Sequence, residues 1–126
     1  MPAENLEFGK AAENAAAKFL KGQGYKIIRC NYKTKFGEID IIAQEESVIC
    51  FVEVKARHSK LFGEPSEAVS AIKQRQISKA AICYLKENNL LERAARFDVV
   101  SLLYTHDLPE IDLVKDAFEL SFGFTI

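Results

Sequence analysis

Two stretches of the chain repeat apolar residues at helical spacing. The first covers residues 6–21, where several alanines favour a helix and where Gly22 and Gly24 supply stop signals directly afterwards. The second runs from about Ser70, whose hydroxyl suits an N-cap, to Glu87. Its apolar stripe consists of Ile77, Ala80, Ala81, Tyr84 and Leu85. The pattern therefore predicts two amphipathic helices.

Shorter apolar segments outside these helices predict strands, which cover residues 25–30, 37–43, 48–55 and 97–104. The joint at 44–47 is so short that the second and third strands should form an antiparallel hairpin. The last strand is almost continuously apolar, which is typical of a central strand covered on both faces. Residues 111–120 fit either a further strand or a short helix. This order of elements predicts an α/β fold with one mixed sheet flanked by helices.

Length and composition fit one ordered domain over residues 1–126, with 48% hydrophobic and 28% charged residues. No apolar run is long enough to cross a bilayer, and the N-terminus lacks the regions of a signal peptide. We therefore expect a cytoplasmic protein without membrane contact. Cys30, Cys50 and Cys83 are scattered singly, which argues against a disulfide framework or structural zinc and predicts three buried thiols.

Charge is unevenly distributed along the sequence. The net charge is −1 at pH 7, whereas nucleic-acid-binding domains are commonly basic. Basic residues nevertheless predominate in 25–35 and in 55–79, and acidic residues gather after residue 86. A basic face opposite an acidic back and an even scatter after folding both remain open.

Charged side chains interrupt the two strands of the predicted hairpin. Glu38 and Asp40 share one face of the first strand, and Glu53 and Lys55 share one face of the second. If residues 45–46 form the loop, Glu38 lies opposite Glu53 and all four charges share one face. Opposed carboxylates destabilise a sheet, and a divalent cation between Asp40 and Glu53 would relieve the repulsion. The spacing thus predicts a metal site suited to phosphodiester hydrolysis, with Lys55 adding charge to the phosphate.

A purely structural explanation of this pattern stays open. A hairpin with one apolar face and one charged, solvated face shows the same alternation, and periodicity alone favours that explanation. Ile42, Ile49 and Phe51, however, are large apolar residues on the charged face. That face is therefore expected to be covered, which favours a functional site.

Three motifs carry a resemblance to a known family. They are Gly37-Glu38-Ile39-Asp40, Phe51-Val52-Glu53-Val54-Lys55-x-Arg57 and Arg96-Phe97-Asp98-Val99-Val100. With Gly9-x-x-x-Glu13, Asn31, Gly63 and Lys73, they resemble the YraN-like family of bacterial proteins over residues 8 to about 118. This family is similar to the archaeal Holliday-junction resolvases of the PD-(D/E)XK nuclease superfamily. The proline–aspartate pair that names the superfamily is Ile39-Asp40 here.

The resemblance implies a restriction-endonuclease-like fold with an αβββαβ core. It also implies that Asp40 and Glu53 bind Mg²⁺ or Mn²⁺, and that Lys55 orients the attacking water or stabilises the charged phosphorane. Glu13, on the first helix, would be an accessory catalytic carboxylate, although an exposed helix position explains it equally well. Glu38 would be a second-sphere or second metal ligand, or would cap the start of its strand.

Basic and aromatic residues near the motifs suggest contacts with nucleic acid. The candidates for phosphate contact are Arg57, Lys73, Gln74 and Arg75, although a solvated helix surface commonly produces such a run. Three aromatic residues alternate with lysines, as in a surface that stacks single-stranded bases, and core anchoring explains them about as well. These three are Tyr25, Tyr32 and Phe36.

Three further polar residues have simpler interpretations. His58 and His106 have no partner at metal-ligand spacing and are interpreted as surface loop residues. Asp98 opens the last core strand, where we expect it to hydrogen-bond locally or to pair with Arg96.

The sequence supports three functional hypotheses. The first is a metal-dependent DNA endonuclease selective for branched DNA, in which a homodimer would place two sites on a two-fold substrate. The second is a nuclease-fold protein that binds nucleic acid or acts as a scaffold with little catalysis, which the near-neutral charge favours. The third is a protein-interaction module whose hairpin is purely structural.

Overall fold

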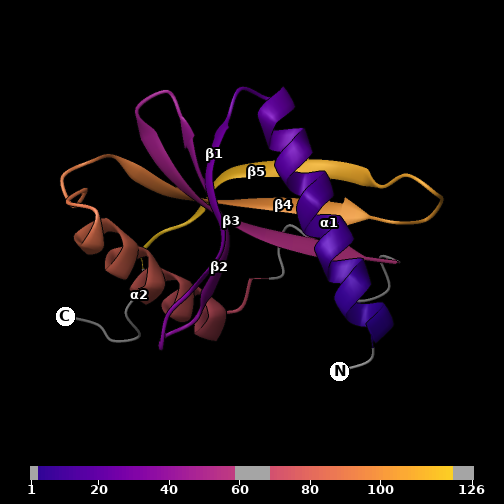
Figure 1. The fold of residues 1–126 in the computed structure, drawn as a ribbon, viewed down its shortest axis with the longest axis horizontal. Helices are drawn as coiled ribbons and strands as arrows, with labels where there is room; N and C mark the ends of the chain where they lie inside the picture. The colour runs from indigo at the N-terminus through magenta and orange to yellow at the C-terminus, as the bar shows by residue number, and fades with distance from the viewer. Residues whose placement is uncertain (1–2, 59–68, 121–126) are drawn as a thin grey trace.

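The computed structural model describes residues 3–58 and 69–120, which form two helices and five strands (Figure 1). In chain order these are α1 (Ala3–Gly22), β1 (Lys26–Lys33), β2 (Glu38–Glu45), β3 (Val48–Arg57), α2 (Ala71–Glu87), β4 (Ala95–Leu103) and β5 (Glu110–Phe118). Both predicted helices and all four predicted strands are present. Within the described ranges, neither helix is long and apolar enough to cross a membrane.

The strands form one mixed sheet in the order β1-β2-β3-β4-β5. The first three strands are an antiparallel meander, β4 runs parallel to β3, and β5 pairs antiparallel with β4. This α/β architecture confirms the predicted fold class and is compatible with a restriction-endonuclease-like fold. The ambiguous stretch at 111–120 is strand β5, and the strand predicted at 97–104 lies between β3 and β5.

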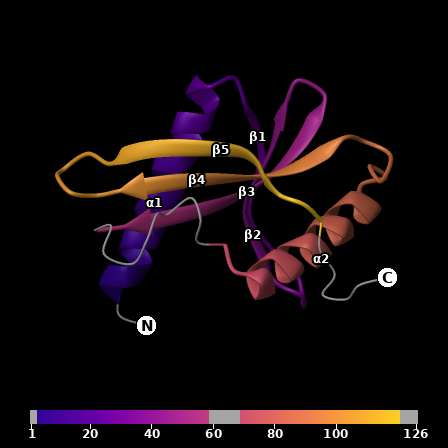
Figure 2. The same cartoon turned by 180° about the vertical axis from the view of Figure 1, so that it is seen from behind.

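Each helix covers one face of the sheet. Ala16 and Leu20 of α1 pack with Cys50, Val52 and residues of β4 in one core cluster. The stripe predicted for α2 is fully buried in a second cluster, which contains Ile42 and Phe51 from the other face of β2 and β3. Figure 1 shows α1 in front of the strands, and Figure 2 shows it behind them. The face that carries Ile42 and Phe51 is therefore covered, as predicted.

The hairpin between β2 and β3 has a different register from the predicted one. Glu45 pairs with Val48 and Gln44 with Ile49, so the loop is formed by residues 46–47 rather than 45–46. Glu46 adopts a left-handed φ of 54°, which makes this two-residue turn possible. The pairing therefore differs by two residues from the prediction. Because side chains alternate with a period of two, the predicted faces are nevertheless preserved.

The three thiols differ in exposure. Cys50 is buried as predicted, Cys83 is half-buried, and Cys30 is exposed. The prediction of a buried thiol was wrong for Cys30 because β1 is an edge strand whose side chains are mostly exposed.

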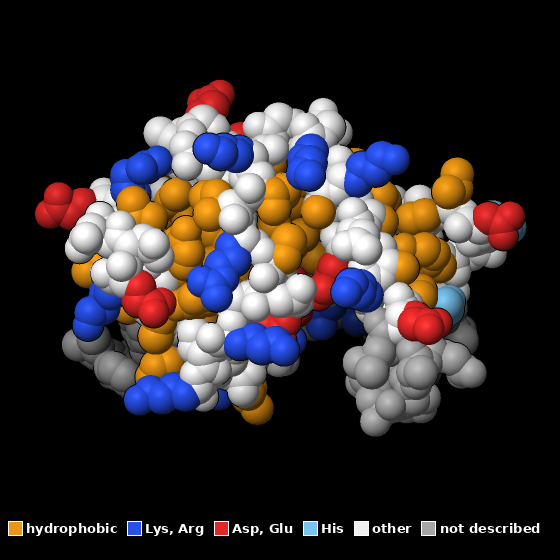
Figure 3. All heavy atoms as spheres, viewed as in Figure 1, with side chains coloured by type: hydrophobic (Ala, Val, Ile, Leu, Met, Phe, Trp, Pro, Cys, Tyr) orange, Lys and Arg blue, Asp and Glu red, His pale blue; other side chains and the backbone are white. Residues whose placement is uncertain are grey.

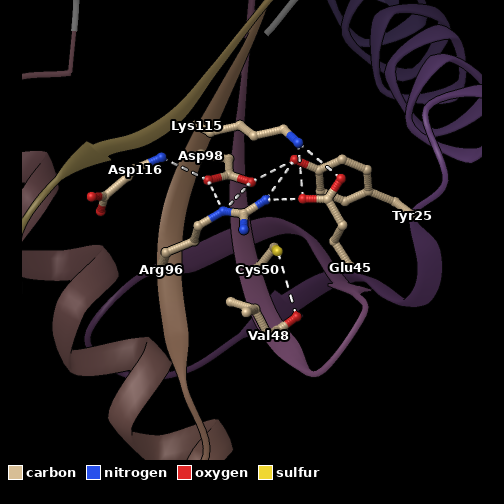
Figure 4. A network of polar contacts seen from close by, with 8 residues as sticks. All are labelled: Tyr25, Glu45, Val48, Cys50, Arg96, Asp98, Lys115 and Asp116. Atoms are coloured by element: carbon tan, nitrogen blue, oxygen red, sulfur yellow. Dashed lines mark hydrogen bonds and ion pairs between the residues drawn. The ribbon is translucent and has the colours of Figure 1, made fainter.

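An ion-pair network around buried Asp98 connects β2, β4 and β5 with Tyr25, the residue before β1, near the β2–β3 turn (Figure 4). Asp98 is fully buried and accepts hydrogen bonds from Arg96 Nε at 2.9 Å, from the Tyr25 hydroxyl at 2.8 Å and from the Asp116 backbone N–H at 3.0 Å. Arg96 also contacts Glu45 Oε1 at 2.6 Å. The predicted pairing of Asp98 with Arg96 is confirmed, and its role here is to hold the sheet together.

Candidate metal centre

The candidate site lies where β2 and β3 separate. Their pairing ends at Ile41 and Val52, although β2 begins at Glu38 and β3 continues to Arg57. Figure 1 shows the two strands leaving each other in different directions beyond this point. Beyond the last pair, the backbone N–H of Val54 donates to Asp40 Oδ2 at 2.8 Å. Strand divergence thus leaves room for the half-buried Asp40 carboxylate, and the Val54 N–H fixes its position.

Asp40 and Glu53 lie beside each other in this opening. Continuing the observed register by one residue places them directly opposite, and the charge of Asp40 raises the pKa of Glu53, so the two carboxylates lie close together. Glu53 is only 5% exposed. Its Oε1 contacts Lys73 Nζ of α2 at 3.3 Å, whereas its Oε2 has no hydrogen-bond partner among the residues that the structure describes. A buried carboxylate oxygen therefore remains available for a ligand.

Helix α1 contributes a third carboxylate to the site. Carboxylate oxygens of Glu13, Glu38 and Asp40 lie within 4.8 Å of one another, the one such cluster found in the described part of the chain. With its amide nitrogen facing the carboxylates, Asn31 donates to Glu38 Oε1 at 2.9 Å and to Glu13 Oε2 at 3.1 Å. Asn31 has a left-handed φ of 55°, a conformation that Asn tolerates well. The structure thus brings Glu13 to Asp40, as the resemblance implied.

Burial makes these carboxylates harder to ionise. Desolvation, followed by the charge of Asp40, raises the pKa of Glu53 to about 7, and Lys73 opposes part of this rise. Desolvation also raises the pKa of Asp40, opposed by its hydrogen bond from Val54. The pKa of Glu13 is raised by burial and then by Asp40. Gathered negative charge with incomplete compensation is the electrostatic signature of a cation site.

The raised pKa of Glu53 predicts pH-dependent stability in metal-free protein. Because folding raises this pKa from 4.5 to about 7, the folded state favours the protonated carboxyl. Stability should therefore fall as the pH rises from about 5 to about 8. Glu53→Gln should remove most of this loss, roughly 1–3 kcal/mol, and should be more stable than the wild type at about pH 8.

Urea denaturation in EDTA at the two pH values measures this effect. Glu92→Gln is the matched control because Glu92 is an exposed carboxylate outside the site, and it should follow the wild type. A wild-type stability that does not change over this interval would contradict a raised pKa of Glu53 in the folded protein.

The donor set fits a divalent cation. Mg²⁺ and Mn²⁺ prefer carboxylate, carbonyl and water oxygens. Asp40 and Glu53 offer such oxygens side by side, and the partnerless Oε2 of Glu53 has a desolvation cost that nothing else in the described residues offsets. The residues present therefore fit the cation that the resemblance implies.

Further polar groups line the continuation of this face along β3 and β4. Lys55 is half-buried, and its charge lowers the pKa of Glu53, so it lies near the carboxylates. Ser101 of β4 pairs opposite Lys55 and is 4% exposed. Within the described ranges, Ser101 Oγ and Arg57 Nε are buried without hydrogen-bond partners. The sequence analysis did not single out Ser101 as a residue of this face. Its polar hydroxyl within an otherwise apolar strand could have indicated it.

The residues predicted to contact phosphates have different environments. Ser70 caps α2 by accepting the backbone N–H of Lys73 at 3.1 Å, as predicted, and the Lys73 side chain is directed to Glu53. Gln74 Nε2 donates to the Val69 carbonyl at 2.9 Å and so stabilises the helix start. Arg75 is half-buried on the first turns of the helix. Lys73 therefore belongs to the carboxylate site itself.

The histidines and tyrosines lie outside the site. His58 is exposed and stacks on Phe8 with 4.4 Å between ring centroids, and His106 is exposed on the β4–β5 connection. Tyr25 and Tyr32 are each 4% exposed, so core anchoring explains them. Phe36 alone of the three predicted stacking residues remains at the surface.

Comparison with known proteins places this site in a sequence family. A model described as "Uncharacterised protein family UPF0102" matches residues 12–102, which include Glu13, Asp40, Glu53 and Lys55. The chain belongs to this family. UPF0102 proteins of Geotalea uraniireducens and Syntrophus aciditrophicus are each 47% identical over 95% of this chain and 95% and 94% of their own length. The UPF0102 protein of Myxococcus xanthus is 41% identical over 94% of both chains.

Proposed function

We propose that this protein is a divalent-metal-dependent endonuclease that hydrolyses phosphodiester bonds in DNA, with selectivity for branched structures. The observation that carries the proposal is the paired Asp40 and Glu53 at the strand opening, where a buried Glu53 oxygen has no partner within the described residues. The α/β fold and the family resemblance are consistent with this chemistry. Action on two-fold substrates as a homodimer is part of the same proposal.

Each residue of the site would have a separate role in hydrolysis. Asp40 and Glu53 would hold Mg²⁺ or Mn²⁺, with Glu13 as an accessory carboxylate beside Asp40. A bound divalent cation lowers the pKa of water and neutralises charge on the phosphate oxygens. Lys55, on the same face as Glu53, would orient the attacking water or add positive charge to the phosphate.

Cationic side chains around the carboxylates would position the DNA backbone. Arg57 and Arg75 would contact phosphates, and Lys73 would be released toward the DNA when a cation replaces it at Glu53. Arg57 is well placed for this because its buried Nε lacks a partner in the described part of the chain. Gln74 contributes less, since its amide N–H already serves the start of α2.

A cleavage assay on defined DNA structures tests the proposal. Purified protein is incubated with Mn²⁺ or Mg²⁺ and labelled four-way junction, flap, single-stranded and duplex DNA, with EDTA in parallel. We expect metal-dependent cleavage, greater on branched than on duplex DNA, and no cleavage by Asp40→Ala purified in the same way. Cleavage by Asp40→Ala at the wild-type rate would mean that the activity does not come from this site, and this result or the absence of cleavage from every substrate would contradict the proposal.

The ion pair between Lys73 and Glu53 favours a second candidate function. A lysine that neutralises Glu53 makes the site stable without a metal, as expected of a nuclease fold that binds DNA or acts as a scaffold with little catalysis. In that case DNA binding would be unaffected by EDTA and by Glu53→Gln, and none of the four DNAs would be cut.

A further inference from the structure

Phe36 is an exposed aromatic residue at the tip of the β1–β2 turn. Its exposed fraction is 38%, whereas Tyr25 and Tyr32 are buried. The turn precedes Glu38 and Asp40 directly along the chain. A single exposed apolar side chain is common on a protein surface, so the surroundings of Phe36 carry the argument.

The backbone of this turn is held in one conformation. The Thr34 hydroxyl accepts the backbone N–H groups of Phe36 at 3.0 Å and Gly37 at 3.2 Å. The Thr34 backbone N–H donates to the Gly37 carbonyl at 2.9 Å. Gly37 packs against α2 so closely that a Cβ there would lie 3.0 Å from Gln76 Cβ. Phe36 is therefore presented outward on a turn that is fixed by its own hydrogen bonds and by the helix.

Two lysines from different elements contact the Phe36 ring. Lys35 Nζ lies 5.2 Å and Lys79 Nζ 5.7 Å from the ring centroid, the latter reaching it from α2. Exposed contacts of this kind are weak compared with the stacking of a nucleobase on an aromatic ring. A base can therefore take their place on the ring, and the two flexible ammonium groups are then free to meet the flanking phosphates.

The surroundings of Phe36 fit a polyanion that continues into the metal centre. Next to the turn lies a groove of about 450 Å³, in which three cationic side chains, Arg29, Lys33 and Lys86, outnumber the one carboxylate, Glu87. Lys and Arg side chains are spread over the face that carries β1, β2 and α2 (Figure 3). Three residues lie between Phe36 and Asp40, so the Cα atoms of the two are at most about 13 Å apart. A base on Phe36 would therefore lie about two nucleotides from a phosphate at the metal centre.

We propose that Phe36 is a stacking platform for an unpaired base of a DNA substrate, with Lys35 and Lys79 binding the phosphates on either side of it. In a continuous duplex every base is stacked on its neighbours, so only single-stranded, flapped or gapped DNA offers a free base to this ring. The spacing of about two nucleotides between the stacked base and the cleaved bond rests on the proposed nuclease function. The binding of unpaired DNA by Phe36 does not depend on that function.

The proposal is tested by DNA binding under conditions that prevent cleavage. Fluorescence anisotropy in EDTA compares labelled single-stranded, flap and duplex DNA. Phe36→Ala should weaken binding to single-stranded and flap DNA about tenfold or more and leave duplex binding nearly unchanged. Phe36→Trp, which keeps an aromatic face, should bind like the wild type, and Leu108→Ala is the control for loss of another exposed apolar side chain. Lys79→Gln should weaken binding to single-stranded and flap DNA more than to duplex DNA, and should lower the salt dependence of that binding.

Two outcomes would overturn the proposal. One is unchanged binding of all three DNAs by Phe36→Ala, which would leave Phe36 as an apolar contact for a protein. The other is an equal loss on all three DNAs, which would assign Phe36 to the fold or to general charge. These results are separate from the nuclease proposal, because that one is tested by cleavage and by metal binding, and this assay in EDTA measures neither.

Discussion

Replacing Asp40 by asparagine is expected to lower metal-dependent DNA cleavage about a thousandfold or more. The substitution removes the charge of one of two carboxylates that would hold the cation, and cation stabilisation of the transition state is worth several kcal/mol. A loss of about 4 kcal/mol corresponds to about three orders of magnitude in rate. Asparagine keeps an oxygen that can accept the Val54 N–H, so the strand opening should persist.

The matched control for this variant is Asp107→Asn, which removes a charge from an exposed residue of the β4–β5 connection. It should cleave at the wild-type rate, and both variants should show the wild-type circular dichroism spectrum. An Asp40→Asn variant that folds normally and retains more than about a tenth of the wild-type rate would contradict the assignment of Asp40 as a metal ligand.

Asp98→Ala is expected to destabilise the fold by about 3–5 kcal/mol. Asp98 is fully buried, and its removal leaves the buried parts of Arg96, the Tyr25 hydroxyl and the Asp116 N–H without their shared acceptor (Figure 4). Breaking a buried ion pair from one side costs more than the pair contributes, because the partner's charge stays buried. Urea denaturation at about pH 7 measures the change in the free energy of unfolding.

Lys115→Ala is the matched control within the same network. Lys115 is 49% exposed and pairs with Glu45 at 2.8 Å, so its loss should cost no more than about 1 kcal/mol. If Asp98→Ala lowers stability by no more than Lys115→Ala does, the network around Asp98 does not hold the sheet together.

The hairpin that carries Asp40 and Glu53 could be predicted from alternation alone. The predicted register was wrong by two residues because nothing in the sequence marks Glu46 as the residue that takes the left-handed conformation. An even shift leaves every side chain on its own face, so the grouping of the carboxylates was still correct. What the pattern could not show is that the strands separate at this point.

The pattern of apolar and polar residues could not predict contacts between elements that are far apart in the sequence. Lys73 was predicted as a phosphate contact because a helix surface looks the same whether it faces solvent or a buried carboxylate, and only the packing of α2 places it at Glu53. The proximity of Glu13 to Asp40 came from the family resemblance, since helical periodicity gives no position relative to a strand. Strand β5 could not be distinguished from a helix, because its exposure does not alternate regularly.

The central claim is that Asp40 and Glu53 together bind a divalent cation, and isothermal titration calorimetry with Mn²⁺ tests it most directly. The account predicts saturable binding to the wild type at about pH 8, weaker binding as the pH falls through about 7, and loss of most binding in Asp40→Asn and Glu53→Gln. Equal Mn²⁺ affinity in the wild type and both variants, all correctly folded, would contradict the claim and with it the nuclease mechanism.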